Sequence, residues 1–147
     1  MKLILQHPWF VWPTLKATRQ AVLYSNAHFG SGHHTNTPAN AFRHSIWNYL
    51  IANYCSRWDK NEEVVLFWAT YITDLHELVL PGDALANAMD RHNNKVGRWV
   101  FKENKKATLS KGLSLLLGLT RASVQITTLE ELKAIPNNQL VHLIAPE

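Results

Sequence analysis

The sequence contains a single cysteine, Cys55, in 147 residues. One cysteine cannot form an internal disulfide, so the class of small secreted folds that disulfides hold together is excluded. Cys55 lies among apolar neighbours near the end of a predicted helix, where a buried and unreactive thiol is expected. A reducing compartment is the simplest interpretation of this cysteine content.

Long hydrophobic runs are also absent. No apolar stretch approaches the ~20 residues that span a bilayer, and the apolar residues 3–5 are too few for the core of a signal peptide. We therefore expect a cytoplasmic protein without a transmembrane segment, and secretion without a signal peptide stays open. The HExxH, CxxC, Walker and Rossmann glycine patterns are missing too, so no strong motif decides the function.

The sequence does have enough apolar material for one core. Apolar residues make up 46% of the chain and charged residues 18%, and six Trp, five Phe and four Tyr supply large side chains. The length favours one domain, and the composition is unlike that of disordered chains. The formal net charge is +4, which is compatible with an anionic partner without requiring one.

Hydrophobic periodicity predicts a mainly α protein, a compact bundle of about five helices. The predicted helices cover residues 14–27, 38–56, 60–79, 84–102 and 110–119. Two prolines bracket residues 8–13, which predicts an extended segment ahead of the first helix. The third helix is apolar on nearly every side, and such a helix is usually central and buried.

Capping patterns mark the starts of four helices, because side-chain oxygens there can accept from free backbone N–H groups. The patterns are Thr37 before Pro38, Asp59 with Glu62, Asp83, and Thr128 with Glu131. The last of them opens a short helix over residues 129–135 in the tail of the chain.

The tail differs in character from the bundle and predicts a small C-terminal strand–helix–strand appendage. Residues 123–127 and 140–144 have the pattern of short strands on either side of a helix. We interpret residues 1–147 as a single domain, with a motif-bearing helical core at 36–103 and the appendage at 123–147.

The second helix carries a row of polar side chains. Asn40, His44 and Asn48 recur every four residues and therefore share one side of the helix. Arg43 lies beside this side. A solvated surface would not concentrate amides and a histidine in this way on an otherwise apolar helix, so the row is a candidate part of a site.

The next two predicted helices also carry polar residues within largely apolar sequences. His76 and Glu77 follow an aromatic and aliphatic stretch on the third helix, where a buried carboxylate needs a partner from elsewhere in the chain. Asp90, Asn94 and Gly97 share one face of the fourth helix. A glycine inside a helix costs about 1 kcal/mol relative to alanine, which predicts that another backbone or a ligand approaches closely at Gly97.

One functional interpretation is a metal centre where the three helices converge. Histidine and carboxylate ligands suit zinc, iron or manganese, and helix bundles commonly hold such sites. A divalent metal ion is therefore a candidate cofactor. Its candidate ligands are His44, His76, Glu77 and Asp90.

A second version of the site needs no metal. His44 or His76 acts as general base, oriented by Glu77 or Asp90, and Arg43 neutralises an anionic substrate or transition state. The residues assigned to substrate binding are Asn40, Asn93 and Asn94. A purely structural alternative also stands, in which the buried polar groups form one satisfied hydrogen-bond network that fixes the helix register.

Two further features could bind a ligand. His33 and His34 adjoin each other in a Gly-Ser loop that could reach the mouth of the site, although such a pair is more often simply exposed. Residues 95–121 carry seven basic side chains against one acid, Glu103, and could meet the phosphates of nucleic acid or lipid. No nucleic-acid module is recognisable, so we favour a solvated lysine-rich loop and expect no specific nucleic acid.

Three blocks of the sequence resemble an uncharacterised bacterial family of helical domains. Residues 40–48, 73–77 and 89–98 contain its patterns A-F-R-H-x-x-W, D-x-H-E and M-D-x-H-N-N-x-x-G-R in the expected order. Members occur alone or at the ends of larger bacterial proteins, some with a toxin-like layout. The resemblance assigns no reaction and implies one site that groups Arg43, His44, His76, Glu77, Asp90, His92, Asn93 and Asn94.

Three hypotheses of function follow. The leading one is a small hydrolase-like enzyme that acts on an anionic or ester substrate, with or without metal. The alternative is a non-enzymatic helical module that binds a protein partner and has a structural polar core. The third is a binder of nucleic acid or of a membrane surface that uses residues 95–121.

Overall fold

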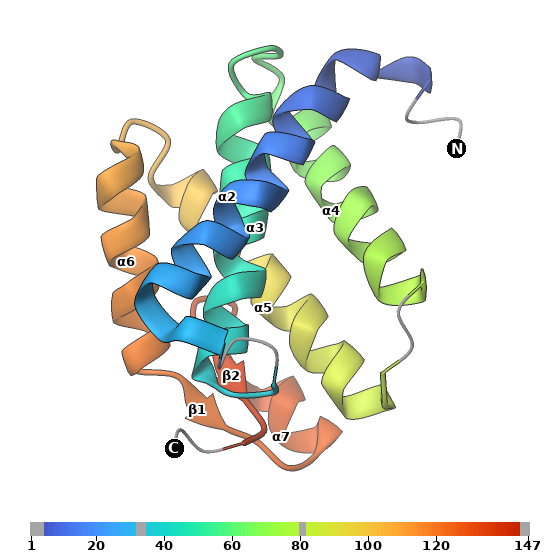
Figure 1. Cartoon of the computed structure of the whole chain (residues 1–147). Coiled ribbons are helices and arrows are strands. Elements are labelled where there is room, and N and C mark those ends of the chain that lie inside the picture. Colours follow the sequence, from blue (N-terminus) through green and yellow to red (C-terminus); the bar gives the residue numbers. More distant parts are fainter. Residues whose placement is uncertain (1–4, 32–34, 80–81, 145–147) are drawn as a thin grey trace.

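The computed structural model describes residues 5–31, 35–79 and 82–144 (Figure 1). It confirms a mainly α-helical bundle with a small appendage near the C-terminus. The elements are η1 (Pro8–Phe10), α2 (Val11–Phe29), α3 (Pro38–Cys55), α4 (Glu62–Val79), α5 (Ala84–Glu103), α6 (Leu109–Arg121), β1 (Val124–Gln125), α7 (Leu129–Ala134) and β2 (Val141–His142). Among the described residues no helix has the length and apolarity that a membrane crossing requires.

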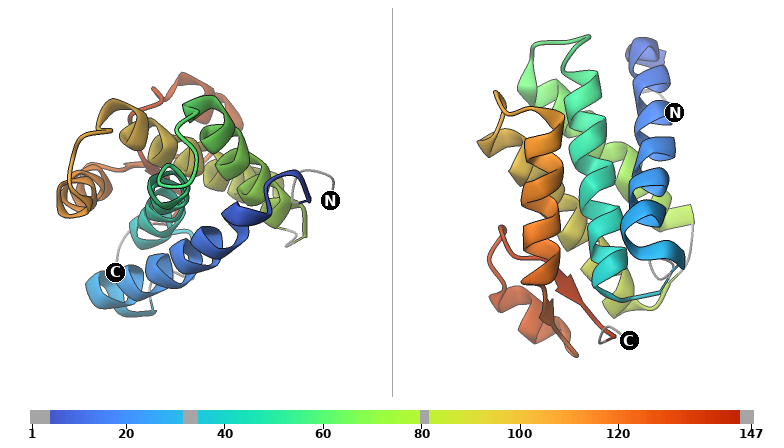
Figure 2. Two further views of the ribbon diagram at one scale, coloured as in Figure 1. Left: turned by 90° about the horizontal axis from the view of Figure 1, so that it is seen from above. Right: turned by 60° about the vertical axis from the view of Figure 1, so that its left-hand side comes forward.

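The central helix is α3, and the expectation that the helix over residues 60–79 is central is wrong. α2, α4, α5 and α6 all pack against α3, which lies in the middle of the bundle when it is viewed from above (Figure 2). Small side chains such as Ala41, Ser45 and Ala52 are completely buried and let neighbouring helices approach α3 closely. α4 instead leaves Phe67 60% and Leu78 72% exposed.

The N-terminal segment is helical, which corrects the extended conformation predicted for residues 8–13. Pro8 opens the short η1 helix and Pro13 lies in the first turn of α2. A proline is tolerated in a first turn because the N–H that it lacks would have no partner inside the helix. The side chain of Thr14 then links the start of α2 to α4, since it accepts a 2.8 Å hydrogen bond from Trp68 Nε1.

Most of the predicted helix starts are confirmed. Pro38 is the first residue of α3, and the Asp83 side chain accepts a 2.8 Å hydrogen bond from Ala86 N at the start of α5. The start of α4 differs, because Asn61 and not Asp59 accepts from the first-turn N–H groups, at 3.1 Å from Glu63 N.

Gly97 lies where α5 crosses α3, and the close approach predicted for this glycine is confirmed. A Cβ added to Gly97 would lie 2.0 Å from the carbonyl oxygen of Ser45, well inside any allowed contact. Glycine is therefore required here for the two backbones to touch. His44 precedes Ser45 and Asn94 lies one turn before Gly97, so this contact also places the polar faces of the two helices against each other.

The appendage has the predicted strand–helix–strand order. β1 and β2 form a parallel pair in which Val124 faces Val141. The predicted capping box of Thr128 and Glu131 is present at the start of α7. Val141 and Ile126 are buried against Met89 of α5, which attaches the appendage to the bundle.

Candidate functional site

The site lies where α3, α4 and α5 converge at one end of the bundle, in a pocket of about 290 Å³. Its described lining residues are Asn36, Asn40, Arg43, His44, His76, Glu77, Gly82, Asp83, Ala86, Asn87 and Asp90. The three predicted motif blocks therefore do meet. His44 is at the base of the pocket, where only 1% of its side chain is exposed.

His44 lies between two carboxylates that belong to different helices. Glu77 of α4 approaches one side of the ring, with Oε1 3.6 Å from Nδ1. Asp90 of α5 approaches the other side, with Oδ1 3.3 Å from Nε2. Glu77 is almost fully buried, whereas 15% of the Asp90 side chain is exposed toward the pocket.

The neighbours of His44 determine where its proton sits. Arg43 Nη2 lies 2.8 Å from Nε2, and a guanidinium can only donate, so Nε2 must accept. The ring proton is then on Nδ1, which donates to Asn94 Oδ1 at 3.3 Å. Asp90 can share a hydrogen bond with the unprotonated Nε2 only when the carboxyl group itself carries a proton.

The protonation equilibria of these groups agree with this arrangement. Burial and, to a smaller extent, the charge of Glu77 raise the pKa of Asp90 to about 7, while Arg43 and the Asn40 hydrogen bond oppose the rise. Burial and the charge of Arg43 hold the pKa of His44 well below its usual value, so the imidazole is neutral. Near neutral pH Asp90 is therefore the member of the pair that gains and loses a proton, while His44 stays neutral.

Glu77 carries its charge in a poorly compensated position. Burial raises the pKa of this carboxyl, and the positive charge of Arg43 and the nearby Asn94 amide oppose the rise. The amide is near but out of hydrogen-bonding geometry, because Glu77 Oε1 and Asn94 Nδ2 have no hydrogen-bond partner among the described residues. A buried carboxylate oxygen without a partner is costly, which marks this point as one that a ligand or a proton could satisfy.

Asn40 holds Arg43 and Asp90 in place at the pocket wall. Its Oδ1 accepts from Arg43 Nη2 at 2.8 Å and from Nε at 3.2 Å, and its Nδ2 donates to Asp90 Oδ1 at 3.1 Å. One amide thus fixes both a positive charge and a titratable carboxyl. The predicted placement of Asn40 in the site agrees with this geometry.

A second layer of polar residues supports the centre. Asn48 belongs to the predicted polar row of the second helix, whereas Arg98 was not assigned to the predicted site. Asn48 Nδ2 donates to Asn94 Oδ1 at 2.7 Å, and Asn48 Oδ1 accepts from Arg98 Nη1 at 2.5 Å and from Thr73 Oγ1 at 3.3 Å. Burial lowers the pKa of Arg98 to about 10, against the opposing charge of Asp74. Helix spacing grouped Asn48 with His44 and could also have found Arg98, since Arg98 follows Asn94 by four positions.

Some predicted site residues lie outside the centre. Asn93, expected to bind substrate, points to the appendage, where it donates to Val141 O at 2.9 Å and accepts from Val141 N at 3.0 Å. His92 contacts the carbonyl of Gln139. Adjacent helix residues differ by about 100° in direction, which is why the neighbours Asn93 and Asn94 serve different parts of the fold.

His76 takes an intermediate place. It lines the pocket, and its ring packs edge-on against Trp47 at 5.1 Å between centroids. Burial and the charge of Arg43 lower its pKa. His33 and His34, the other histidines considered for the site, lie outside the described residues.

The described residues contain one group whose ligand atoms could surround a metal ion. One atom each from His44, Glu77 and Asp90 lies within 4.8 Å of the other two. His76, the fourth predicted ligand, is not in this group. The two carboxylates, however, flank different nitrogens of the imidazole, and Arg43 donates to one of these nitrogens.

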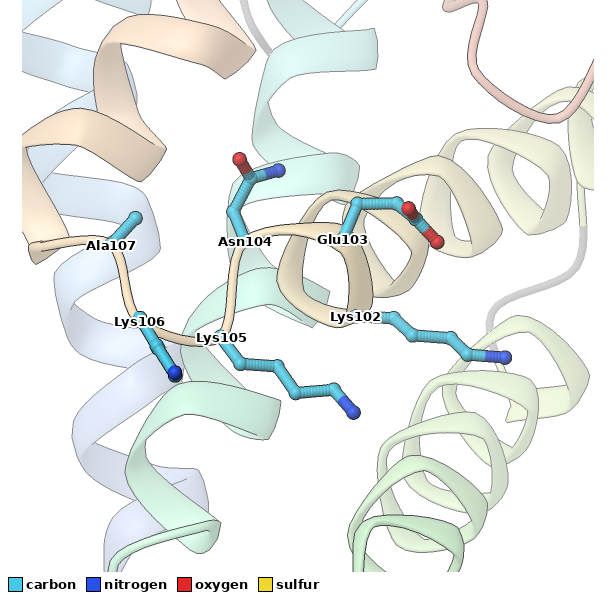
Figure 3. A pocket seen from close by; sticks show the side chains of 6 residues that line it. All are labelled: Lys102, Glu103, Asn104, Lys105, Lys106 and Ala107. Carbon is cyan, nitrogen blue, oxygen red and sulfur yellow. The ribbon is translucent and has the colours of Figure 1, made fainter.

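The basic segment forms a separate feature at the turn between α5 and α6. A shallow pocket there is lined by residues 102–107, and Figure 3 shows the lysine side chains fanning away from the turn while Asn104 points to the opposite side. Lys105 forms an ion pair with Glu62 of α4. One of the basic charges is therefore already neutralised within the fold.

Comparison with known proteins places the chain in a family. The family model described as "Domain of unknown function (DUF6973)" matches residues 1–124, and the chain belongs to this family. No curated protein and no solved structure matches the chain. The match contains α2 to α6 and the whole polar centre, whereas most of the appendage follows it.

Proposed function

We propose that this protein is a small hydrolase-like enzyme in which Asp90, paired with His44 at the base of the pocket, exchanges protons with the substrate. The observation that carries the proposal is the position of the His44 ring between Asp90 and Glu77 at the base of an open pocket. A buried imidazole held by carboxylates on both sides is a costly arrangement that packing alone does not require.

The roles of the residues follow from their contacts. Asp90 in its ionised form accepts a proton from a water molecule as the water oxygen attacks the carbonyl or phosphoryl centre. The protonated Asp90 then delivers this proton to the leaving oxygen as the ester bond breaks. A pKa near 7 suits both steps, because efficient general acid–base groups titrate near the working pH.

Arg43, His44 and Glu77 prepare this exchange without leaving their positions. Arg43 is next to Asp90 and His44 and supplies positive charge for an oxygen that becomes negative during the reaction. His44 keeps its proton on Nδ1, on the side of Asn94 and Glu77, so that Nε2 accepts from Arg43 and faces Asp90, whose protonated form can also donate to it. An anionic or ester substrate of a size that fits the pocket is the class that this set of groups would accommodate.

The experiment compares Asp90→Asn with Asp83→Asn on a panel of chromogenic carboxylate and phosphate esters. Asp83 lines the same pocket but caps α5, and asparagine caps as well as aspartate. We expect Asp90→Asn to lower kcat/KM by about 10²-fold or more, with Asp83→Asn close to wild type. Equal activities for the two variants, or a folded wild-type protein that turns over no ester, would contradict the proposal.

A divalent metal centre is the second candidate. It is favoured by the three clustered ligand atoms and by the buried Glu77 Oε1 without a partner among the described residues. It requires Arg43 to move from His44 Nε2, since a dication and a guanidinium repel each other there. For this reason we rank it below the metal-free site.

Metal content separates the two candidates. Protein purified without a His-tag would be analysed for bound metals, together with Glu77→Gln and its control Glu63→Gln, an exposed carboxylate in the first turn of α4. One equivalent of metal that Glu77→Gln loses and Glu63→Gln keeps would establish the metal centre. A metal-free wild type that still turns over esters would support the acid–base site.

A further inference from the structure

A basic and apolar face on α2 is independent of the polar centre. Trp12, Leu15, Lys16, Arg19 and Leu23 follow the i, i+3, i+4, i+7 and i+11 spacing of one helix side. All five are exposed, with Trp12 at 71% and Leu15 at 59%. We refer to these five residues as the α2 outer face. Figure 1 shows α2 along the outside of the bundle, in front of α3.

One further basic residue, Arg57, adjoins this face. The ring of Tyr54 lies between two cations, with Lys16 Nζ 5.1 Å and Arg57 Cζ 5.4 Å from its centroid. Trp58, which follows Arg57, is 61% exposed. Contact through Tyr54 therefore joins Arg57, in the turn after α3, to Lys16 of the α2 outer face.

Acidic residues are missing from this part of the chain. No Asp or Glu occurs before Asp59, which follows Trp58 directly. Another exposed aromatic, Phe67, lies on α4, whose first turn carries Glu62 and Glu63. The α2 outer face thus combines apolar area with positive charge alone, whereas the apolar side of α4 has acids close by.

We propose that the α2 outer face binds the surface of anionic lipid membranes. Helices that lie in the membrane interface pair Trp and Leu with Lys or Arg, because indoles sit at the headgroup level while basic groups meet lipid phosphates. A protein partner or a second copy with acidic rims would be the competing occupant. The absence of any acid on the face favours a continuous anionic surface, since self-association would bring Lys16 and Arg19 against like charges.

The experiment measures co-sedimentation of the full chain with vesicles of phosphatidylcholine alone and of phosphatidylcholine mixed equally with phosphatidylglycerol. Binding should require the anionic lipid and should weaken strongly near 1 M salt, where the Debye length is about 3 Å. Lys16→Ala combined with Arg19→Ala should weaken binding roughly 25-fold, because each basic residue near an anionic surface contributes about five-fold. Trp12→Ala should also reduce the bound fraction.

Matched variants test whether the effect belongs to this face. Lys111→Ala combined with Lys133→Ala removes two exposed charges from α6 and α7, and Phe67→Ala removes an exposed aromatic from α4. These controls should bind within about two-fold of wild type, as expected for charges and rings away from the contact surface. Equal losses in the controls, or binding to neither vesicle, would overturn the proposal. A different result would favour self-association over membrane binding. In that case the protein would not bind vesicles, and light scattering would show a dimer that the Trp12→Ala variant no longer forms.

Discussion

α3 and α4 have the same length and similar apolar content, yet they occupy different environments. Fifteen of the 18 residues of α3 are buried, against five of the 18 in α4. The difference lies in the small and polar residues. α3 intersperses Ala, Ser and Asn with its large side chains and can be approached from every side, whereas the bulky apolar residues of α4 cover a wide arc that no other described helix contacts in full. Apolar richness alone therefore does not identify the central helix of a small bundle.

The largest expected effect tests this comparison directly with one phenylalanine on each helix. Phe42 of α3 is completely buried and Phe67 of α4 is 60% exposed. Phe42→Ala should lower the free energy of unfolding by about 3–5 kcal/mol, because it removes buried area and leaves a cavity. Phe67→Ala should change it by less than about 0.5 kcal/mol. Urea unfolding of both variants measures this, and similar losses would show that α4 is buried in solution.

The next largest effect concerns Asp90 of α5, whose carboxyl group faces His44 of α3 and Glu77 of α4. Because the pKa of Asp90 in the fold is about 7, above the unfolded value of about 3.9, the folded state binds an extra proton between these pH values and loses stability as the pH rises through this window. Asn at position 90 does not titrate, so the Asp90→Asn variant lacks this loss of stability. The difference in unfolding free energy, variant minus wild type, should therefore increase by about 2–4 kcal/mol from pH 4 to pH 7 and stay constant above pH 7.

Urea midpoints at several pH values give this difference. The comparison with wild type matters, because burial lowers the pKa values of His44, His76 and His92 and makes the fold more stable as the pH rises toward 6.5. These contributions are common to both proteins. Parallel pH profiles for the two proteins would mean that Asp90 is solvated in the folded state.

The contact between α3 and α5 can be tested with two glycines. A methyl group at Gly97 would lie 2.0 Å from Ser45 O, whereas one at Gly118 of α6 meets nothing within 4 Å. Gly97→Ala should therefore lower the free energy of unfolding by about 1–3 kcal/mol through strain. Gly118→Ala should raise it by up to about 1 kcal/mol, since alanine is the better helix former. Thermal melts decide between these outcomes, and a stabilising Gly97→Ala would contradict the close packing.

The smallest expected effect concerns the polar link from α4 to α3. Thr73 Oγ1 lies 3.3 Å from Asn48 Oδ1 across the two helices and 2.9 Å from Ala69 O of its own helix, and its one proton can be shared between them. Thr70 Oγ1 donates to Leu66 O of its own helix and has no cross-helix partner among the contacts that the structure shows. Thr73→Val should cost about 1 kcal/mol of unfolding free energy, the usual value of one buried hydrogen bond. Thr70→Val should be nearly neutral. Chemical denaturation of both variants at one pH measures this difference. Equal losses of unfolding free energy for the two variants would mean that the contact between Thr73 and Asn48 does not stabilise the fold.

Local signals in the sequence predicted much of the fold. Pro38, Asp83, Gly97 and the Thr128 capping box each act within one helix turn or at one contact, so their effects can be read from neighbouring residues. The extended segment at residues 8–13 was predicted wrongly because prolines are equally compatible with the first turn of a helix. Which helix is central depends on how all the helices pack together, and periodicity within one helix does not contain that information.

The candidate site was predicted in part for the same reason. Helix spacing grouped Asn40 with His44, and Asp90 with Asn94, and the structure brings these residues together. Asn93 was assigned to the site because it adjoins Asn94 in the third motif block, although a step of one residue turns its side chain toward the appendage. The order of contacts around the His44 ring depends on the crossing of three helices and could not be derived from spacing within each.

The contact between Gly97 and Ser45 also acts as a pivot for the site. Along α5, Asn94 lies about 4.5 Å and Asp90 about 10.5 Å from Gly97, given a rise of about 1.5 Å per residue. A small tilt of α5 about this point therefore moves Asp90 roughly twice as far as Asn94. Both residues precede Gly97, so a change in the crossing angle of α5 would shift Asp90 more than Asn94. Such a change would alter the Nε2 side of the His44 ring, where Asp90 lies, more than the Nδ1 side, where Asn94 lies.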